Sequence, residues 1–162
     1  MGNRLHVTTP SDREIAMERV FDAPRELVFE AHTSCEHMAN WWGPHGYTFG
    51  ACELDFRPGG KWRIVHRSPE GEEFTFYGEF REIVPPERIV WTFGFEGMPG
   101  EPAVETLTLE EHDGKTTLRA LSVYDSRATR DAMLESGMES GASESMERLD
   151  DYLEVLEARA AR

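Results

Sequence analysis

The sequence has only two cysteines, Cys35 and Cys52, among its 162 residues. Two thiols cannot build the disulfide framework of a small secreted domain, and there is no Cys-x-x-Cys pair. No apolar run approaches the roughly 20 residues that a membrane-spanning helix needs. The first 13 residues are polar and lack the apolar stretch of a secretory signal. We therefore expect a cytoplasmic protein with two isolated cysteines.

Basic residues are also scarce. Lysine and arginine total 17 against 31 aspartates and glutamates, which gives a net charge of −14 with neutral histidines. Such a chain repels nucleic-acid phosphates and anionic membrane surfaces, so we expect neither as a partner. Hydrophobic residues make up 39% of the chain, and its length suits one globular domain. We expect any ligand to be neutral or apolar.

Motifs for metal, phosphate and nucleophile sites are missing. His32, His37 and His45 do not have the spacing of a metalloprotease helix. Pro58-Gly59-Gly60 is a hairpin turn without the helix or the lysine of a P-loop. There is no Gly-x-Ser-x-Gly elbow for a catalytic serine. We expect no metal and no cofactor.

Aromatic side chains, in contrast, are concentrated in one region, and 13 of the 17 lie between Trp41 and Phe95. Apolar residues alternate with polar ones through this region, which is typical of β-strands. With a first strand before it and two after it, seven strands are predicted: residues 14–21, 52–56, 62–66, 74–80, 89–95, 104–109 and 116–124. Their short connections, including the Asp113-Gly114 hairpin turn, favour an antiparallel sheet.

Two helical regions interrupt the strands. Asp22-Ala23-Pro24 predicts the start of a short helix after the first strand, because proline suits the first helical turn. Thr33 and Glu36 have the spacing of a capping box, which predicts a second short helix toward Trp41.

At the C-terminus, Ser126 predicts the cap of a short helix that Gly137 ends. From Met138 onward, an apolar stripe predicts a long amphipathic helix. The stripe consists of Ala142, Met146, Leu149, Leu153 and Leu156. We expect an α+β fold, in which a curved antiparallel sheet of about six to seven strands wraps around this helix. Residues 1–12 are predicted to be a flexible arm, and residues 13–160 a single domain.

Five ordered fragments carry a family resemblance. They are residues 18–29, Trp41-Trp42-Gly43-Pro44, residues 57–62, residues 82–89 and residues 134–141. Together they resemble the SRPBCC (START/Bet v 1-like) superfamily, and within it the activator of Hsp90 ATPase homologue 1-like (AHSA1-like) branch, from about Arg13 to Leu156. The resemblance implies a helix-grip fold, in which the sheet and the last helix enclose a central cavity.

Three functions are compatible with this fold, because it hosts many activities. The first, which we favour, is binding of a small hydrophobic or aromatic molecule in the cavity. The second is a cyclase, dehydratase or hydrolase that uses polar cavity residues. The third is a chaperone-modulating (Hsp90 ATPase activator-like) interaction protein. A homodimer also stays open.

Candidate cavity residues come from the aromatic strands and the C-terminal helices. They are Trp41, Trp42, Phe56, Trp62, Ile64, His66, Phe76, Tyr77, Trp91, Phe93, Arg119, Met138, Ala142 and Met146. For the Trp41-Trp42 pair there are two alternatives. One indole gates the entrance of the cavity, or both tryptophans are structural, which is the more common case. His66 is either an acid–base group or a hydrogen-bonded core histidine. Members of the branch often carry a tryptophan where this chain has Ala142, so the alanine enlarges the cavity if it faces inward.

Polar residues on the strands leave one question open. Tyr77 and Glu79, and across two hairpins Glu105, Arg119 and Tyr124, either face solvent or form a polar patch inside the sheet. Alternation alone does not choose between the two faces, and exposed cross-strand pairs are the more common case. The enzyme hypothesis requires a polar residue that points inward with a perturbed pKa, and its candidates are His66, Tyr77, Glu79, Glu105 and Arg119.

Overall fold

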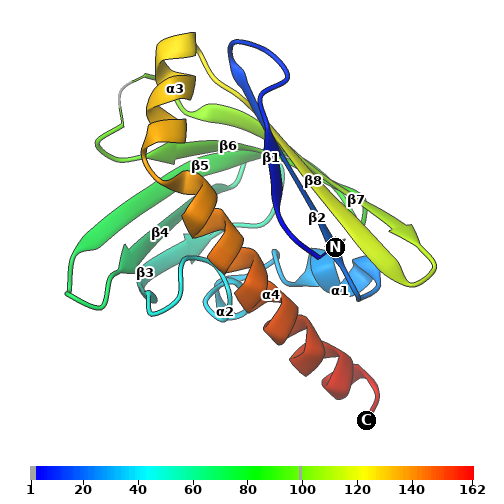
Figure 1. The fold of residues 1–162 in the computed structure, drawn as a ribbon. Coiled ribbons are helices and arrows are strands. Elements are labelled where there is room, and N and C mark those ends of the chain that lie inside the picture. The colour runs from blue at the N-terminus through cyan, green and yellow to red at the C-terminus, as the bar shows by residue number, and fades with distance from the viewer. Residues whose placement is uncertain (1–2, 99) are drawn as a thin grey trace.

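The computed structural model describes residues 3–98 and 100–162, which form an eight-stranded antiparallel sheet and four helices (Figure 1). The strands are β1 (His6–Thr8), β2 (Glu14–Phe21), β3 (Thr48–Leu54), β4 (Lys61–Arg67), β5 (Glu73–Val84), β6 (Arg88–Phe95), β7 (Ala103–His112) and β8 (Lys115–Val123). The helices are α1 (Arg25–Glu30), α2 (Cys35–Met38), α3 (Arg127–Glu135) and α4 (Met138–Ala160). The sheet order is β1-β2-β8-β7-β6-β5-β4-β3. The predicted α+β helix-grip architecture is confirmed, with one strand more than expected.

The additional strand lies in the segment predicted as a flexible arm. Residues 6–8 pair antiparallel with residues 16–18 of β2, so the arm does not extend over all of residues 1–12. Residues 1 and 2 lie outside the described part of the chain. A three-residue strand shows too little alternation to be recognised in a sequence.

Helices α1 and α2 carry the chain from β2 to β3, which lie near opposite edges of the sheet. Helix α1 begins directly after Pro24, as predicted. The N-cap of the second helix is one residue later than predicted, and it is a single serine cap instead of the Thr33–Glu36 box. The Ser34 hydroxyl accepts a hydrogen bond from the His37 amide at 3.2 Å, whereas the Thr33 hydroxyl donates back to the Glu30 carbonyl at 2.7 Å. Thr33 therefore closes α1, and Ser34 begins α2.

Helix α4 crosses the concave side of the sheet diagonally, and its last turns extend beyond the strands (Figure 1). As predicted, Ser126 caps α3 by accepting from the Thr129 amide at 3.1 Å, and Gly137 separates α3 from α4. The buried residues of α4 are Ser145, Leu149, Tyr152, Leu153 and Leu156. The first half of the apolar stripe, Ala142 and Met146, is only half-buried. The helix is therefore packed more completely along its second half.

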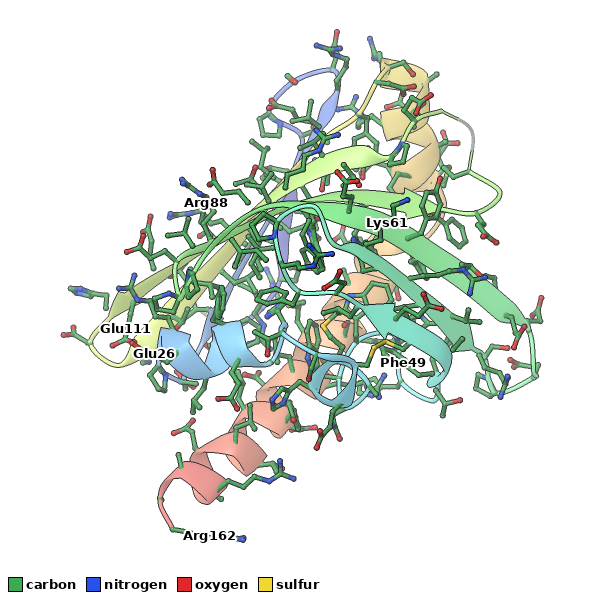
Figure 2. The ribbon with its side chains drawn as sticks, turned by 180° about the vertical axis from the view of Figure 1, so that it is seen from behind. Glu26, Phe49, Lys61, Arg88, Glu111 and Arg162 are labelled. Carbon is green, nitrogen blue, oxygen red and sulfur yellow. A yellow bond between two sulfur atoms is a disulfide. The ribbon has the colours of Figure 1, made fainter. Side chains whose placement is uncertain are left out.

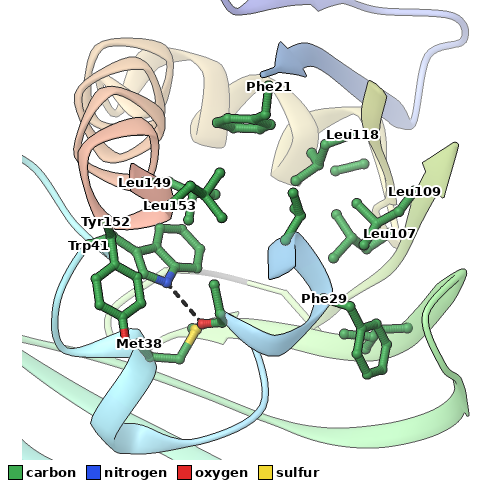
Figure 3. Packing of buried hydrophobic residues seen from close by; sticks show 14 of the residues in the cluster. Phe21, Phe29, Met38, Trp41, Leu107, Leu109, Leu118, Leu149, Tyr152 and Leu153 are labelled. Atoms are coloured by element: carbon green, nitrogen blue, oxygen red, sulfur yellow. Dashed lines mark hydrogen bonds between the residues drawn. The ribbon is translucent and has the colours of Figure 1, made fainter. Parts of the chain in front are cut away.

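The hydrophobic core consists of two separate clusters. The main cluster joins α1, α2 and the second half of α4 to the sheet, and Figure 3 shows part of it. Trp41 lies inside this cluster and donates from Nε1 to the Ala31 carbonyl at 2.9 Å. The small cluster consists of Ile15, Ala103 and Tyr124, with Val7, Met133, Leu134 and Met138 packed against them. It lies where α3 meets the strands.

The structure corrects the expectation of two isolated cysteines. A disulfide joins Cys35 in α2 to Cys52 in β3, with 6.0 Å between the two Cα atoms (Figure 2). The connection between α2 and β3 turns back on itself, so residues 17 positions apart become neighbours. The disulfide attaches α2 to the edge of the sheet.

Reduction of this disulfide is expected to lower the free energy of unfolding by about 3 kcal/mol. The reason is that the bond joins residues 17 positions apart and so closes a loop in the unfolded chain, which reduces its conformational entropy. Urea denaturation with and without dithiothreitol measures the difference. The Cys35→Ser/Cys52→Ser double variant is the control, and its stability should not respond to the reductant. Equal stability of the wild type with and without reductant would contradict the prediction.

Candidate functional site

The inner face of the sheet presents a set of partly exposed aromatic rings. Phe76 stacks on Phe95 with ring centroids 4.8 Å apart, and Trp42 meets Phe76 edge-on at 5.0 Å. Phe93 lies 6.0 Å from the Trp42 ring and 5.2 Å from Trp62. All of these rings except Trp62 are only half-buried, although they lie on the side of the sheet that α4 covers. The aromatic surface is therefore not closed over by the helix.

The core is interrupted opposite the first half of α4. On β7, Ala103 belongs to the small cluster and Leu107 to the main cluster, and Glu105 lies between them. The same interruption occurs on α4, where Met138 packs on the small cluster and Met146 on the main one. Between these methionines the helix carries small side chains, including the half-buried Ala142. Ala142 contributes to neither cluster.

A buried polar group occupies the sheet side of this interruption. The Glu105 carboxylate accepts a hydrogen bond from Trp91 Nε1 at 2.8 Å and another from the Ser122 hydroxyl at 3.0 Å. Register explains the grouping, because Glu105 is directly opposite Trp91 on β6 and Ser122 on β8. Tyr124, directly after the end of β8, is the next inward residue along the chain and is 7% exposed. Neighbouring strands thus place a carboxyl, a hydroxyl, an indole and a phenol on one inner surface.

Burial changes the acidity of two of these groups. Removal from water raises the pKa of the Glu105 carboxyl, and the hydrogen bonds from Trp91 and Ser122 oppose this only in part. Burial, together with the negative charge of Glu105, raises the pKa of Tyr124 to about 12. A carboxyl and a phenol with raised pKa values on one apolar wall are typical of functional sites.

His66 lies on the inner face of β4, enclosed by aromatic rings. Its imidazole centroid is 4.5 Å from Trp42 and 5.4 Å from Phe76, and the residue is 3% exposed. Among the described residues Nε2 has no hydrogen-bond partner. Desolvation lowers the pKa of His66 to about 4, and the charge of Arg148 adds to this. His66 is therefore neutral at physiological pH.

The turn after Trp42 is attached to α4 on the other side of this histidine. Ser145 accepts from the Gly43 amide at 3.0 Å, and Arg148 Nη1 donates to the Gly43 carbonyl at 3.0 Å. Gly43 has a φ of +107°, and a Cβ atom there would lie 2.5 Å from His66 Cε1. Only glycine fits between the imidazole and the helix at this point. The Trp42 ring is thereby held above the aromatic surface of the sheet.

Two candidate cavity residues lie on the outer face of the sheet instead. Tyr77 is 36% exposed, and its ring lies against Gly94 of the neighbouring strand, where a Cβ atom would be 2.5 Å from the ring. Arg119 is half-exposed and pairs with Glu18 at 2.7 Å and Glu110 at 3.3 Å. Neither side chain reaches the interior. Both form exposed cross-strand contacts, which was one of the two alternatives for these residues.

The other candidates divide into two groups. Trp41, Trp62, Ile64 and Trp91 are at most 3% exposed, and with the partly buried Phe56 they pack in the main cluster. Trp42, Phe76, Phe93, Met138, Ala142 and Met146 are half-buried on the facing surfaces of sheet and helix. Their contact with a ligand stays a prediction. Of the residues that the enzyme hypothesis needs, His66 and Glu105 point inward, whereas Glu79 shares the outer face with Tyr77.

Two open hollows lie elsewhere on the surface. One of about 550 Å³ lies on the outer face, lined by residues of β1, β2, β7 and β8, and one of about 640 Å³ adjoins the turn between β3 and β4. Neither lies between the sheet and α4, so the central cavity that the family resemblance implies stays a prediction. Within the described ranges, no three His, Cys, Asp or Glu side chains are placed to hold a metal ion. No described helix is long and apolar enough to span a membrane.

A family comparison agrees with this geometry. The family model described as activator of Hsp90 ATPase homolog 1-like protein matches residues 22–154. The chain belongs to this family. The predicted AHSA1-like branch of the SRPBCC superfamily is therefore confirmed, over most of the chain.

Solved structures show the same fold. A protein from Rhodobacter sphaeroides has a TM-score of 0.87 and 25% identity, over 94% of this chain and 99% of its own. A protein from Chromobacterium violaceum is 28% identical with a TM-score of 0.77, over 89% of this chain and 99% of its own. The AHSA1 protein from Silicibacter pomeroyi is 23% identical with a TM-score of 0.72, over 88% and 98% of the two chains. No curated protein matches the sequence significantly.

Proposed function

We propose that the protein binds a small hydrophobic or aromatic molecule between the inner face of the sheet and the first half of α4. One observation carries the proposal, namely that large apolar side chains on both facing surfaces are half-buried. In a closed core, side chains of this kind pack to high density and lose almost all contact with water. Here Phe76 and Phe93 on the sheet, Met138 and Met146 on the helix, and Trp42 in the turn attached to α4 keep part of their surface free.

The chemistry of the surface supports the same function. Ligand sites are concave and mostly apolar, with a few polar groups that orient the ligand. The aromatic rings supply the apolar area, and Glu105, Ser122 and Tyr124 supply the polar groups. Methionines such as Met138 and Met146 adapt to ligands of different shape, because their side chains are flexible and polarisable. Hydrophobic ligands also commonly bind in the family fold that this chain adopts.

Filling the space beside Ala142 tests the proposal. We expect Ala142→Trp to weaken binding of a neutral solvatochromic dye, such as Nile red, at least about tenfold, because an indole there occupies the interruption in the core. The free energy of unfolding should stay equal or rise, since added apolar contacts replace a gap. Fluorescence titration measures the affinity, and urea denaturation measures the stability.

Ala158→Trp is the matched control. Ala158 lies on the exposed part of the same helix, so an indole there leaves the interior unchanged. Dye binding by this variant should equal that of the wild type. Equal binding by the Ala142→Trp variant, or no binding by the wild type in titration and native mass spectrometry, would rule out the proposed site.

A further inference from the structure

Glu105 is a buried carboxylate without a cationic partner. It is 9% exposed, on a strand face whose other buried residues are Ala103, Leu107 and Leu109. Within the described residues no lysine, arginine or histidine forms an ion pair with it, and its two protein partners, Trp91 and Ser122, are neutral. Other acidic groups of the molecule, such as Glu18 with Arg119, do have basic partners.

This arrangement opposes stability. A buried charge is costly unless it is paired, because it loses its hydration without gaining an opposite charge. A carboxylate offers about four lone-pair positions, and the two hydrogen bonds to Glu105 use only part of them. Apolar side chains of similar volume are often the more stabilising choice at such a buried position. A residue that breaks the pattern of its strand in this way is expected where function requires it.

We propose that Glu105 pairs with the protonated amine of a hydrophobic ligand, so that the molecule bound in the interior is an apolar or aromatic amine. This inference rests on the proposed function and refines it. The sequence alone favours a neutral or apolar ligand, and the buried carboxylate changes that expectation. The amine supplies the positive charge and the N–H donors that the protein does not provide at this position.

The surroundings suit a cation with an apolar body. Trp91 and Tyr124 lie beside the carboxylate, and Phe93 is two residues from Trp91 on the same face of β6. Aromatic faces attract ammonium groups by cation–π interaction, most strongly where water is excluded. The net charge of −14 adds an attractive field for cations around the whole molecule. Half-buried Phe76, Phe95 and Met146 offer apolar contacts for the rest of the ligand.

Three probes of nearly equal shape test the proposal: naphthalen-1-ylmethylamine, naphthalen-1-ylmethanol and 1-naphthoic acid. Isothermal titration calorimetry at pH 7 gives the affinity of each for the whole chain. We expect the amine to bind at least about tenfold more tightly than the alcohol, and the acid to bind most weakly. In Glu105→Gln the preference for the amine should disappear, while the alcohol binds as before. Glutamine keeps the size of the side chain and removes its charge.

Glu110→Gln is the matched control, since Glu110 lies on the same strand but on the outer face, paired with Arg119. It should keep the full preference for the amine. Equal binding of the three probes to the wild type overturns this inference and leaves the proposed function intact. Binding of none of them removes the proposed function itself. The wild-type comparison needs no variant, so it decides the matter even if Glu105→Gln does not fold.

Discussion

Acidification from pH 7 to pH 4 is expected to destabilise the protein through two buried histidines, each by about 3 kcal/mol. His32 and His66 are both 3% exposed. Desolvation lowers the pKa of each to about 4, from an ordinary value of 6.5. For His32 the hydrogen bond to the Val28 carbonyl, 2.7 Å long, opposes the shift only in part. Both imidazoles are neutral in the folded protein.

The sign follows from the order of protonation. As the pH falls below about 6.5, the unfolded chain takes up protons at both histidines while the folded protein does not. The stabilisation is therefore complete above pH 6.5 and is lost progressively down to about pH 4. Glu105 acts in the opposite direction, because its pKa is raised in the folded state and acidification favours its neutral form. The carboxyl offsets part of the loss from the histidines.

Urea denaturation between pH 8 and pH 4 measures this effect. His32→Gln and His66→Gln remove one titrating group each, so each should flatten the curve of stability against pH by about 3 kcal/mol. His112→Gln is the control, because this side chain is 92% exposed, and its curve should follow that of the wild type. A curve that stays equally steep in both buried-site variants would show that other groups cause the acid sensitivity.

The fold was predictable because its main elements are long and periodic. Strand β2 and the helices α1, α3 and α4 begin at or next to the residues that the sequence indicates. Strand β1 and the disulfide could not be predicted from the sequence, and the reason is the same for both. Neither His6–Thr8 nor the separation of Cys35 and Cys52 carries a local signal, and both depend on which segments meet in three dimensions.

The site was only partly predictable, because alternation shows which residues share a face but not which face is inside. Glu105 and Arg119 are both charged residues within alternating strands, yet one is buried and the other half-exposed. Their neighbours two positions away do differ. Ala103 and Leu107, both apolar, flank Glu105, whereas Arg119 lies between the polar Thr117 and Leu121. That local comparison would have placed Glu105 inside, but its grouping with Ser122 required the register of the sheet.

Replacement of Trp41 by alanine is expected to lower the free energy of unfolding by about 4 kcal/mol, in the range for buried tryptophans. Trp41 is 1% exposed, lies edge-on to His32 at 4.8 Å, and donates to the Ala31 carbonyl. Its removal leaves a cavity in the main cluster and an unsatisfied buried acceptor. Urea denaturation at pH 7 measures the change.

Trp42→Ala is the matched comparison, because the adjacent tryptophan is half-buried on the proposed ligand surface. We expect it to lose about half as much stability, since less of its surface is removed from water in the folded state. Its effect on Nile red affinity should be the larger of the two, because Trp42 lies over Phe76 and Phe93 while Trp41 does not. A Trp41→Ala variant that keeps its stability but loses dye binding would reverse these roles. In that case Trp41 would be the tryptophan that contacts the ligand. The turn that Ser145 and Arg148 attach to α4 would then orient the Trp41 ring instead of the Trp42 ring.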